Sequence, residues 1–130
     1  MRVALPFAAL LASALAGCAG FPRTSPQADL TQALRGRVAS APVRCINLQQ
    51  VRSVAVFERT GLLYDTGRTL YLNRTGRPGS LRALDILGTR SFAGQLCRGE
   101  PVNLIDPSTR SLRSFVTLGE FVPYRRAGGN

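Results

Sequence analysis

The segment VRSVAVFERTGLLYDTGRTLYLN, residues 51–73, decides the fold class of this chain. Its first eight residues include three valines and a phenylalanine, which favour an extended strand. Its last five residues alternate in hydrophobicity, with Leu70 and Leu72 on one face of the expected strand and Tyr71 on the other. Threonine–glycine pairs between the two runs indicate turns. The segment therefore predicts short strands joined by tight turns.

The same pattern continues on both sides of this segment. The predicted strands are residues 43–48, 51–58, 69–73, 80–84, 92–97, 102–105, 111–118 and 121–122. The predicted turns are Thr60-Gly61, Thr66-Gly67, Thr75-Gly76, Pro78-Gly79, Arg98-Gly99 and Asp106-Pro107. Turns at intervals of roughly 10–15 residues, with little helical periodicity, predict a mainly β domain that forms a small antiparallel barrel or sandwich.

One short helix is expected before the β domain. Ser25 offers a capping hydroxyl, and Pro26 suits the first position of a helix. Leu30 begins an apolar stripe at helical spacing, and Gly36 is a natural stop. These signals predict a helix over about residues 26–35.

The N-terminus resembles the leader of a bacterial lipoprotein. Arg2 supplies a positive charge, and the apolar run at residues 3–15 falls short of the roughly 20 residues that a membrane-spanning helix needs. Leu15-Ala16-Gly17-Cys18 follows, and in such leaders the cysteine takes a diacylglyceryl group before cleavage. Ordinary secretory cleavage is the alternative, because Ala14-Leu15-Ala16 fits the small-x-small rule.

Lipidation of Cys18 would fix the location of the protein. Each buried methylene of an acyl chain contributes about 0.8 kcal/mol, so the three chains of a Gram-negative lipoprotein would hold it firmly. In the lipoproteins that this leader resembles, aspartate after the cysteine retains the protein in the inner membrane. Ala19 stands there, so the resemblance implies the periplasmic face of the outer membrane. The predicted organisation is a signal peptide at residues 1–17, a lipidated tether with the short helix at residues 18–42, the β domain at residues 43–124 and a disordered tail at residues 125–130.

The cysteine count predicts one disulfide. Lipidation of Cys18 leaves Cys45 and Cys97, an even pair in an oxidising compartment. An intramolecular bridge is the favoured interpretation, and a free thiol or an intermolecular bridge is the alternative. Closing a loop of about 50 residues would contribute roughly 4 kcal/mol on the chain-entropy model.

The charge balance predicts an anionic partner. All 17 basic residues are arginine, there are seven acidic residues, and the formal net charge of +10 falls to +9 when Arg2 leaves with the leader. Such a domain is attracted to anionic lipid, lipopolysaccharide or peptidoglycan. Nucleic acid is disfavoured by the compartment and by the lack of a recognition motif.

Several kinds of chemistry are excluded by residue type. The chain has no histidine, which removes Ser-His-Asp and Cys-His catalysis and histidine metal sites. Cysteine catalysis would need a free thiolate, whereas Cys45 and Cys97 are expected to be oxidised. No glycine-rich phosphate loop follows a strand, so no cofactor is expected.

The string Leu62-Leu63-Tyr64-Asp65-Thr66-Gly67 resembles the active-site turn of aspartic proteases. That chemistry needs two such aspartates sharing a proton. The family's apolar-apolar-glycine segment has a superficial match at Ile86-Leu87-Gly88, which lies too close to Asp65 in sequence. The favoured interpretation is a hairpin turn in which Asp65 caps its own backbone and Gly67 takes a positive φ.

Carboxylates and aromatic side chains offer two weaker signals. A pair of carboxylates could cleave glycosides, and the candidates are Asp29, Glu58, Asp65, Asp85, Glu100, Asp106 and Glu120. Most of them are better explained as partners of arginines. The aromatic candidates for a ligand platform are Phe57, Tyr64, Tyr71, Phe92, Phe115, Phe121 and Tyr124. Most of these must be core in so small a domain, and Tyr71 is expected to face outward.

The C-terminal half resembles an uncharacterised family of small exported Gram-negative proteins. The residues that carry the resemblance are Leu96-Cys97-Arg98-Gly99-Glu100-Pro101-Val102, Leu118-Gly119-Glu120-Phe121-Val122-Pro123-Tyr124, Arg44-Cys45-Ile46 and Thr69-Leu70-Tyr71. Such relatives often carry a second cysteine pair, near Ile86 and Phe115, and this chain has neither member. That loss agrees with pairing of Cys45 with Cys97. The resemblance implies export and a similar fold, and it supplies no catalytic residues.

The sequence favours a lipid-anchored, non-enzymatic module that binds or stabilises an anionic component of the cell envelope. A small hydrolase using Asp65 or a carboxylate pair is the first alternative. The second is an inhibitor of an enzyme, as small lipid-anchored β-barrels that block lysozyme are. Because lysozyme is itself basic, such an inhibitor would need an acidic target.

Overall fold

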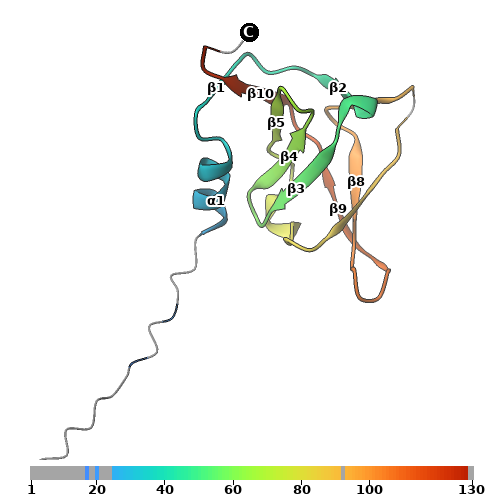
Figure 1. Ribbon diagram of the computed structural model, residues 1–130. Helices are drawn as coiled ribbons and strands as arrows, with labels where there is room; N and C mark the ends of the chain where they lie inside the picture. Colours follow the sequence, from blue (N-terminus) through green and yellow to red (C-terminus); the bar gives the residue numbers. More distant parts are fainter. Residues whose placement is uncertain (1–16, 18–19, 21–24, 92, 129–130) are drawn as a thin grey trace, which may run out of the picture.

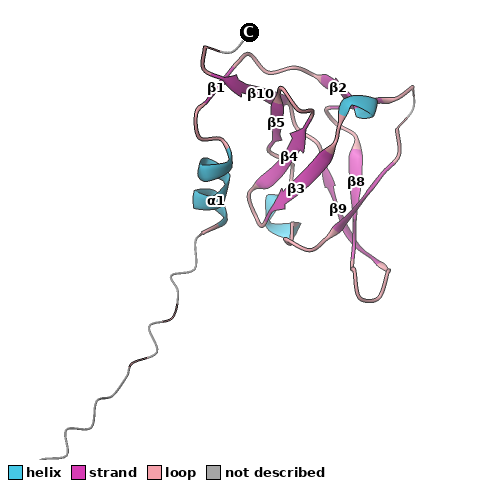
Figure 2. Cartoon of the chain, viewed as in Figure 1, coloured by secondary structure: helices cyan, strands magenta, loops and turns pink. Residues whose placement is uncertain are grey.

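The computed structural model describes residues 17, 20, 25–91 and 93–128. Strands are the main regular structure of the domain, with one α-helix at its side (Figures 1 and 2). In chain order the elements are α1 (Pro26–Ala33), β1 (Arg37–Ala39), β2 (Cys45–Asn47), the 3-10 helix η1 (Leu48–Gln50), β3 (Ser53–Phe57), β4 (Gly61–Asp65), β5 (Leu70–Asn73), the 3-10 helix η2 (Pro78–Ser80), β6 (Ile86–Thr89), β7 (Gln95–Cys97), β8 (Pro101–Ile105), β9 (Leu112–Thr117) and β10 (Phe121–Arg126).

The strands form three antiparallel sheets. The largest has the order β1-β10-β5-β4-β3, the second pairs β2 with β7, and the third has the order β6-β8-β9. The sheets do not close into a barrel, and the domain is sandwich-like. The predicted fold class, mainly antiparallel β with one short N-terminal helix, is therefore confirmed.

The helix α1 covers one face of the five-stranded sheet. The Ser25 hydroxyl accepts a hydrogen bond of 3.2 Å from the backbone N–H of Ala28, as the capping signal predicted. Leu30 is buried and packs with Leu63 and Leu72 of the sheet. The helix ends at Ala33, two residues before the predicted end.

The strand β4 is buried on both faces. Its side chains alternate between two apolar layers, so Leu63 faces α1 while Leu62 and Tyr64 enter the main core. A strand covered on both faces loses the alternation of apolar and polar residues that marks a half-exposed strand. For this reason the sequence indicated only the turns at either end of residues 61–65 and missed the strand itself.

The main core joins all three sheets. Its buried members are Ile46, Leu62, Tyr64, Leu81, Leu96, Val102, Leu104, Val116, Leu118 and Phe121. The rings of Tyr64 and Phe121 meet edge to face, with centroids 5.6 Å apart. Because β2, β4, β7, β8, β9 and β10 all contribute to this one core, the described residues form a single folding unit.

Three predictions about where elements lie are wrong. The strand expected at residues 80–84 is instead the end of η2 and a loop, and the strand follows at β6. The tail expected from residue 125 is partly ordered, because β10 continues to Arg126 and pairs with β1. β1 lies within the segment expected to be a tether. The pairing of β1 with the end of β10 has no local signal, because it joins distant parts of the chain.

The loop between η2 and β6 is fixed by a buried ion pair. The guanidinium of Arg113 on β9 binds both carboxylate oxygens of Asp85 and donates to the carbonyl of Ser80 at 2.6 Å. The Asp85 side chain, only 2% exposed, also accepts from the backbone N–H of Arg82 at 2.9 Å. Multiple hydrogen bonds of this kind offset the cost of burying a charge. The loop is therefore held firmly against the three-stranded sheet.

A buried asparagine joins two sequence-distant segments. The Asn73 side chain donates to the carbonyl of Gly119 at 2.8 Å and accepts from its N–H at 2.9 Å. A Cβ atom at Gly119 would lie 2.5 Å from the carbonyl oxygen of Arg74, so only glycine fits there. Asn73 thus acts like one rung of a β-ladder between the end of β5 and the β9–β10 connection.

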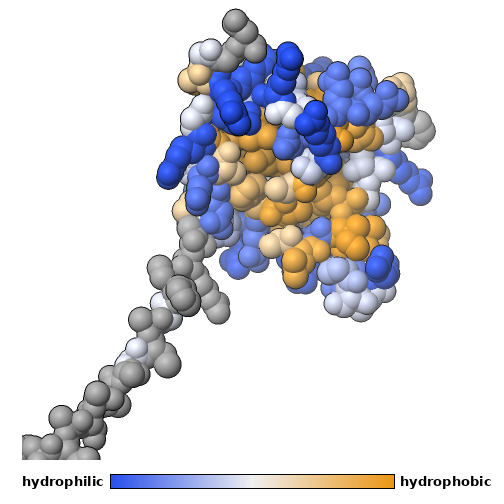
Figure 3. All heavy atoms as spheres, viewed as in Figure 1, coloured by the Kyte–Doolittle hydropathy of each residue, from blue (hydrophilic) through white to orange (hydrophobic). Residues whose placement is uncertain are grey.

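The outer face of the three-stranded sheet carries apolar side chains. Residues directly opposite in neighbouring strands share a face, and Ile86, Ile105 and Leu112 stand opposite one another across β6, β8 and β9. Phe115 lies on the same face, opposite Asn103 of β8. Figure 3 shows apolar surface over the middle and lower part of the domain, around β3 and the loop after η2 in Figure 1, and more hydrophilic surface at the tip of the β8–β9 hairpin.

We predict that Asn73→Ala lowers the free energy of unfolding by about 3 kcal/mol. The substitution leaves the partly buried N–H and C=O of Gly119 without the partners that the buried Asn73 side chain gives them, and each unpaired group costs about 1–3 kcal/mol. Urea unfolding followed by circular dichroism measures the change. Asn103→Ala, on the partly exposed outer face of β8, is the matched control and is expected to change stability by less than about 0.5 kcal/mol. Equal losses in the two variants would contradict the prediction.

Candidate functional site

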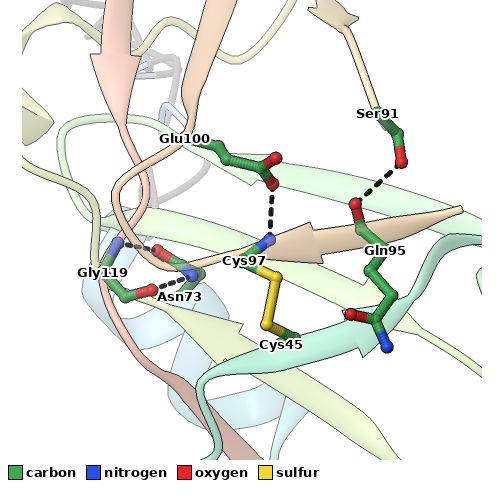
Figure 4. Close-up of a disulfide and its surroundings, with 7 residues drawn as sticks. All are labelled: Cys45, Asn73, Ser91, Gln95, Cys97, Glu100 and Gly119. Carbon is green, nitrogen blue, oxygen red and sulfur yellow. Dashed lines mark hydrogen bonds between the residues drawn. A yellow bond between two sulfur atoms is a disulfide. The ribbon is translucent and has the colours of Figure 1, made fainter. Parts of the chain in front are cut away.

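Cys45 and Cys97 form the predicted intramolecular disulfide (Figure 4). The two residues stand opposite each other in the β2–β7 pair, with their Cα atoms 4.0 Å apart. The bond closes a loop between residues 52 positions apart in the sequence. Because β2 and β7 pair with each other over three residues only, the disulfide is the main covalent support of this small sheet.

The polar groups around the disulfide are used within the fold. The Glu100 carboxylate accepts a hydrogen bond from the backbone N–H of Cys97, and Ser91 donates to the carbonyl of Gln95 at 2.7 Å (Figure 4). The Arg98-Gly99 turn is bound to the β9–β10 connection, because the N–H of Gly99 donates to the carbonyl of Leu118. This cluster therefore stabilises structure and leaves little polar chemistry for a ligand.

Asp65 caps the hairpin turn between β4 and β5. Its carboxylate accepts a hydrogen bond of 2.7 Å from the N–H of Gly67, whose φ is +94°. The turn is closed by Thr66, which donates to the carbonyl of Thr69 from both its N–H and its hydroxyl. The hairpin interpretation of this string is confirmed. The Ile86-Leu87-Gly88 segment lies in β6, in a different sheet from β4.

Most of the other carboxylates also hold parts of the fold. Asp106 accepts hydrogen bonds from the backbone N–H groups of Thr109 and Ser108 at 3.0 and 2.8 Å, and these bonds lower the pKa of its carboxyl. Glu120 forms an exposed ion pair with Arg98 at 3.0 Å. Asp29 lies in the first turn of α1, where a negative charge favours the helix.

One hollow brings three carboxylates near one another. It has a volume of about 390 Å³ and is lined by Glu58, Arg82, Ala83, Leu84, Asp85, Asp106, Pro107 and Ser108. A glycosidase-type mechanism needs one carboxyl that keeps its proton near neutral pH. Asp85 is bound by Arg113, and the lowered pKa of Asp106 keeps it ionised. Among the described residues, no three histidine, cysteine or acidic side chains lie close enough together to hold a metal ion.

The aromatic prediction is wrong in one respect. Tyr71, expected to face outward, is half-buried and packs against the main core. Among the described residues, Phe115 is the exposed aromatic, and the guanidinium of Arg77 lies 5.6 Å from its ring centroid. Alternation in β9 places Phe115 and Val116 on opposite faces, but it does not say which of the two faces is covered. Phe92 lies outside the described residues.

The surface is dominated by arginine. All the described arginines are exposed except Arg37 and Arg113, which are half-buried. Of the seven acidic residues, only Asp29 and Glu120 are exposed. The fold therefore turns most carboxylates toward backbone N–H groups, while most of the positive charges remain at the surface. The sequence predicted the sign of the net charge but not this separation.

The N-terminal predictions concern residues that the structure does not describe. Cys18 and almost all of the leader lie outside the described residues, so lipidation and cleavage stay predictions. Among the residues that are described, no helix is long and apolar enough to cross a membrane. Comparison of the chain with protein-family models, with curated proteins and with solved structures finds no match in any of the three.

We predict that removing the disulfide lowers the free energy of unfolding by about 4 kcal/mol, because the unfolded chain is released from a large closed loop. The variant is Cys45→Ala with Cys97→Ala, and urea unfolding measures the loss. The slope of the free energy of unfolding against urea concentration is expected to increase, since the released unfolded chain exposes more surface. The unaltered protein under reducing conditions is the control and should match the variant. A variant as stable as the oxidised protein would contradict this role.

We also predict that Tyr64 makes the fold sensitive to alkali. Burial raises the pKa of the Tyr64 phenol above its ordinary value of 10.0. Above about pH 10 the unfolded state loses a proton that the folded state keeps, so the free energy of unfolding falls as the pH rises. Tyr64→Phe removes that titration, and urea unfolding at pH 8 and pH 11 measures it. Tyr124→Phe is the control and should keep the alkaline loss. The same loss in both variants would contradict the assignment to Tyr64.

Proposed function

We infer that the chain is a lipid-anchored protein of the cell envelope whose β domain binds an anionic component of that envelope without catalysing a reaction. The observation that supports this most is the separation of charge described above, with arginines outside and carboxylates engaged within the fold. A surface of one sign raises the local concentration of oppositely charged partners. The lipoprotein-type leader and the oxidised cysteine pair support the same compartment.

The guanidinium groups suit phosphate and carboxylate groups in particular. Arginine presents a planar fork of donors that matches these anions and stays charged at any physiological pH. Lipid phosphates, the phosphates of lipopolysaccharide and the carboxylates of peptidoglycan all carry such groups. The structural roles of Asp65, Asp85 and Asp106 weigh against a carboxylate-dependent hydrolase, because each carboxylate already holds a turn or an ion pair.

The proposal predicts salt-sensitive binding by the mature lipidated protein. Reconstituted in zwitterionic nanodiscs, it is mixed with lipopolysaccharide or with purified sacculi, and the bound fraction is measured at low and high salt. We expect affinity to fall at least about tenfold as screening shortens the range of the charges. Mass spectrometry of the same sample should show loss of residues 1–17 and acyl chains on Cys18. Salt-independent binding, no binding, or an unmodified Cys18 would each contradict the proposal.

A further inference from the structure

The outer face of the three-stranded sheet combines exposed apolar side chains with arginines. We define the docking face by Leu84, Ile86, Leu112 and Phe115, which are 79%, 38%, 65% and 45% exposed, together with Arg82 and Arg110. Isolated exposed apolar side chains are common on proteins, but here they belong to one sheet face and the loop leading into it. Burying them would be favourable in any apolar environment.

Arginines lie near these apolar side chains in the sequence. Arg110 lies in the β8–β9 turn, two residues before Leu112, and Arg82 lies two residues before Leu84. The positive charge of Arg77 stacks over the ring of Phe115. Two of the nearby carboxylates are occupied, since Asp85 is bound by Arg113 and Asp106 caps its own turn, and Glu58 lines the same hollow as Arg82. Exposed apolar side chains flanked by arginines are typical of proteins that lie on anionic bilayers.

The anchor would enter the domain at the same end as this face. The N-terminal end of α1, the β3–β4 turn and the β8–β9 hairpin all lie at one end of the molecule (Figure 1). Glu58 of the β3–β4 turn lines one hollow with Ser25 and a second hollow with Leu84 and Pro107. Ser25 lies seven positions after Cys18, and a segment of that length reaches at most about 25 Å. A lipid on Cys18 would therefore keep this end close to the bilayer.

We propose that the docking face binds the surface of the bilayer that holds the anchor, with Leu84, Leu112 and Phe115 entering the interface and the arginines binding anionic headgroups. This inference rests on the lipid anchor of the proposed function. A second copy of the chain is a poorer occupant, because it would bring the two sets of arginines together. An anionic lipid surface can bury the apolar side chains and bind the arginines at the same time.

The chain suits a fluorescence test because it contains no tryptophan. The lipidated protein carrying Leu112→Trp is reconstituted in vesicles that contain anionic phosphatidylglycerol and lipids brominated on their tails. We expect a blue shift and loss of at least about half of the emission, because the indole enters the interface. The matched control is Val38→Trp, also an exposed apolar side chain, on β1 at the far end of the domain. It should not be quenched.

Removing positive charge tests whether the arginines of the docking face bind the headgroups. In the Leu112→Trp background, Arg82→Gln with Arg110→Gln should reduce quenching at least about twofold, since the headgroup contacts are lost. Arg44→Gln with Arg126→Gln removes the same charge at the far end and should leave quenching unchanged. Equal effects of the two pairs would overturn the inference, because diffuse attraction would then explain them.

The failure of this inference is distinguishable from that of the proposed function. If Leu112→Trp is not quenched while the protein still binds lipopolysaccharide or sacculi in a salt-sensitive way, the docking face is wrong and the proposed function stands. A blue shift without quenching that depends on protein concentration identifies a second copy as the occupant and also overturns the inference.

Discussion

The fold depends on one strand, β4, which is covered on both faces. Leu63 meets the helix α1, and Leu62 and Tyr64 meet side chains from the other two sheets. A small domain buries only part of its surface, so a strand that contributes to two apolar layers at once makes efficient use of few residues. The helix and the smaller sheets are held on opposite sides of the same strand. Loosening β4 would therefore separate both layers together.

The sequence predicts elements whose signals lie in adjacent residues. It does not predict strands that depend on two-sided burial or on pairing with a distant segment. Ser25 and Pro26 predicted the start of α1 because capping depends on adjacent residues. The disulfide followed from counting cysteines on the expectation of an oxidising compartment. β4 was missed because two-sided burial removes the alternation that marks a strand. β1 was missed because its three residues become a strand only by pairing with β10, which lies more than eighty positions later in the sequence.

The candidate site was predictable in its charge but not in its geometry. Seventeen arginines against seven acidic residues already indicate attraction to anions. Which charges face the solvent depends on hydrogen bonds such as Asp85 with Arg113, and on turns such as that of Asp106, which form only in the folded chain. The docking face was also hidden, because alternation in β9 separates Phe115 from Val116 without saying which side the core will cover.

The position of β10 governs the order in which the domain is assembled. β10 is the last strand in chain order, yet it lies inside the five-stranded sheet, between β1 and β5. A chain made from its N-terminus onward presents β1 first, but that strand has its place in the sheet only after residues 121–126 have been added. Pairings between such distant segments are slow to form. A chain that lacked residues 121–126 would therefore leave β1 without a partner strand and β5 with an open edge.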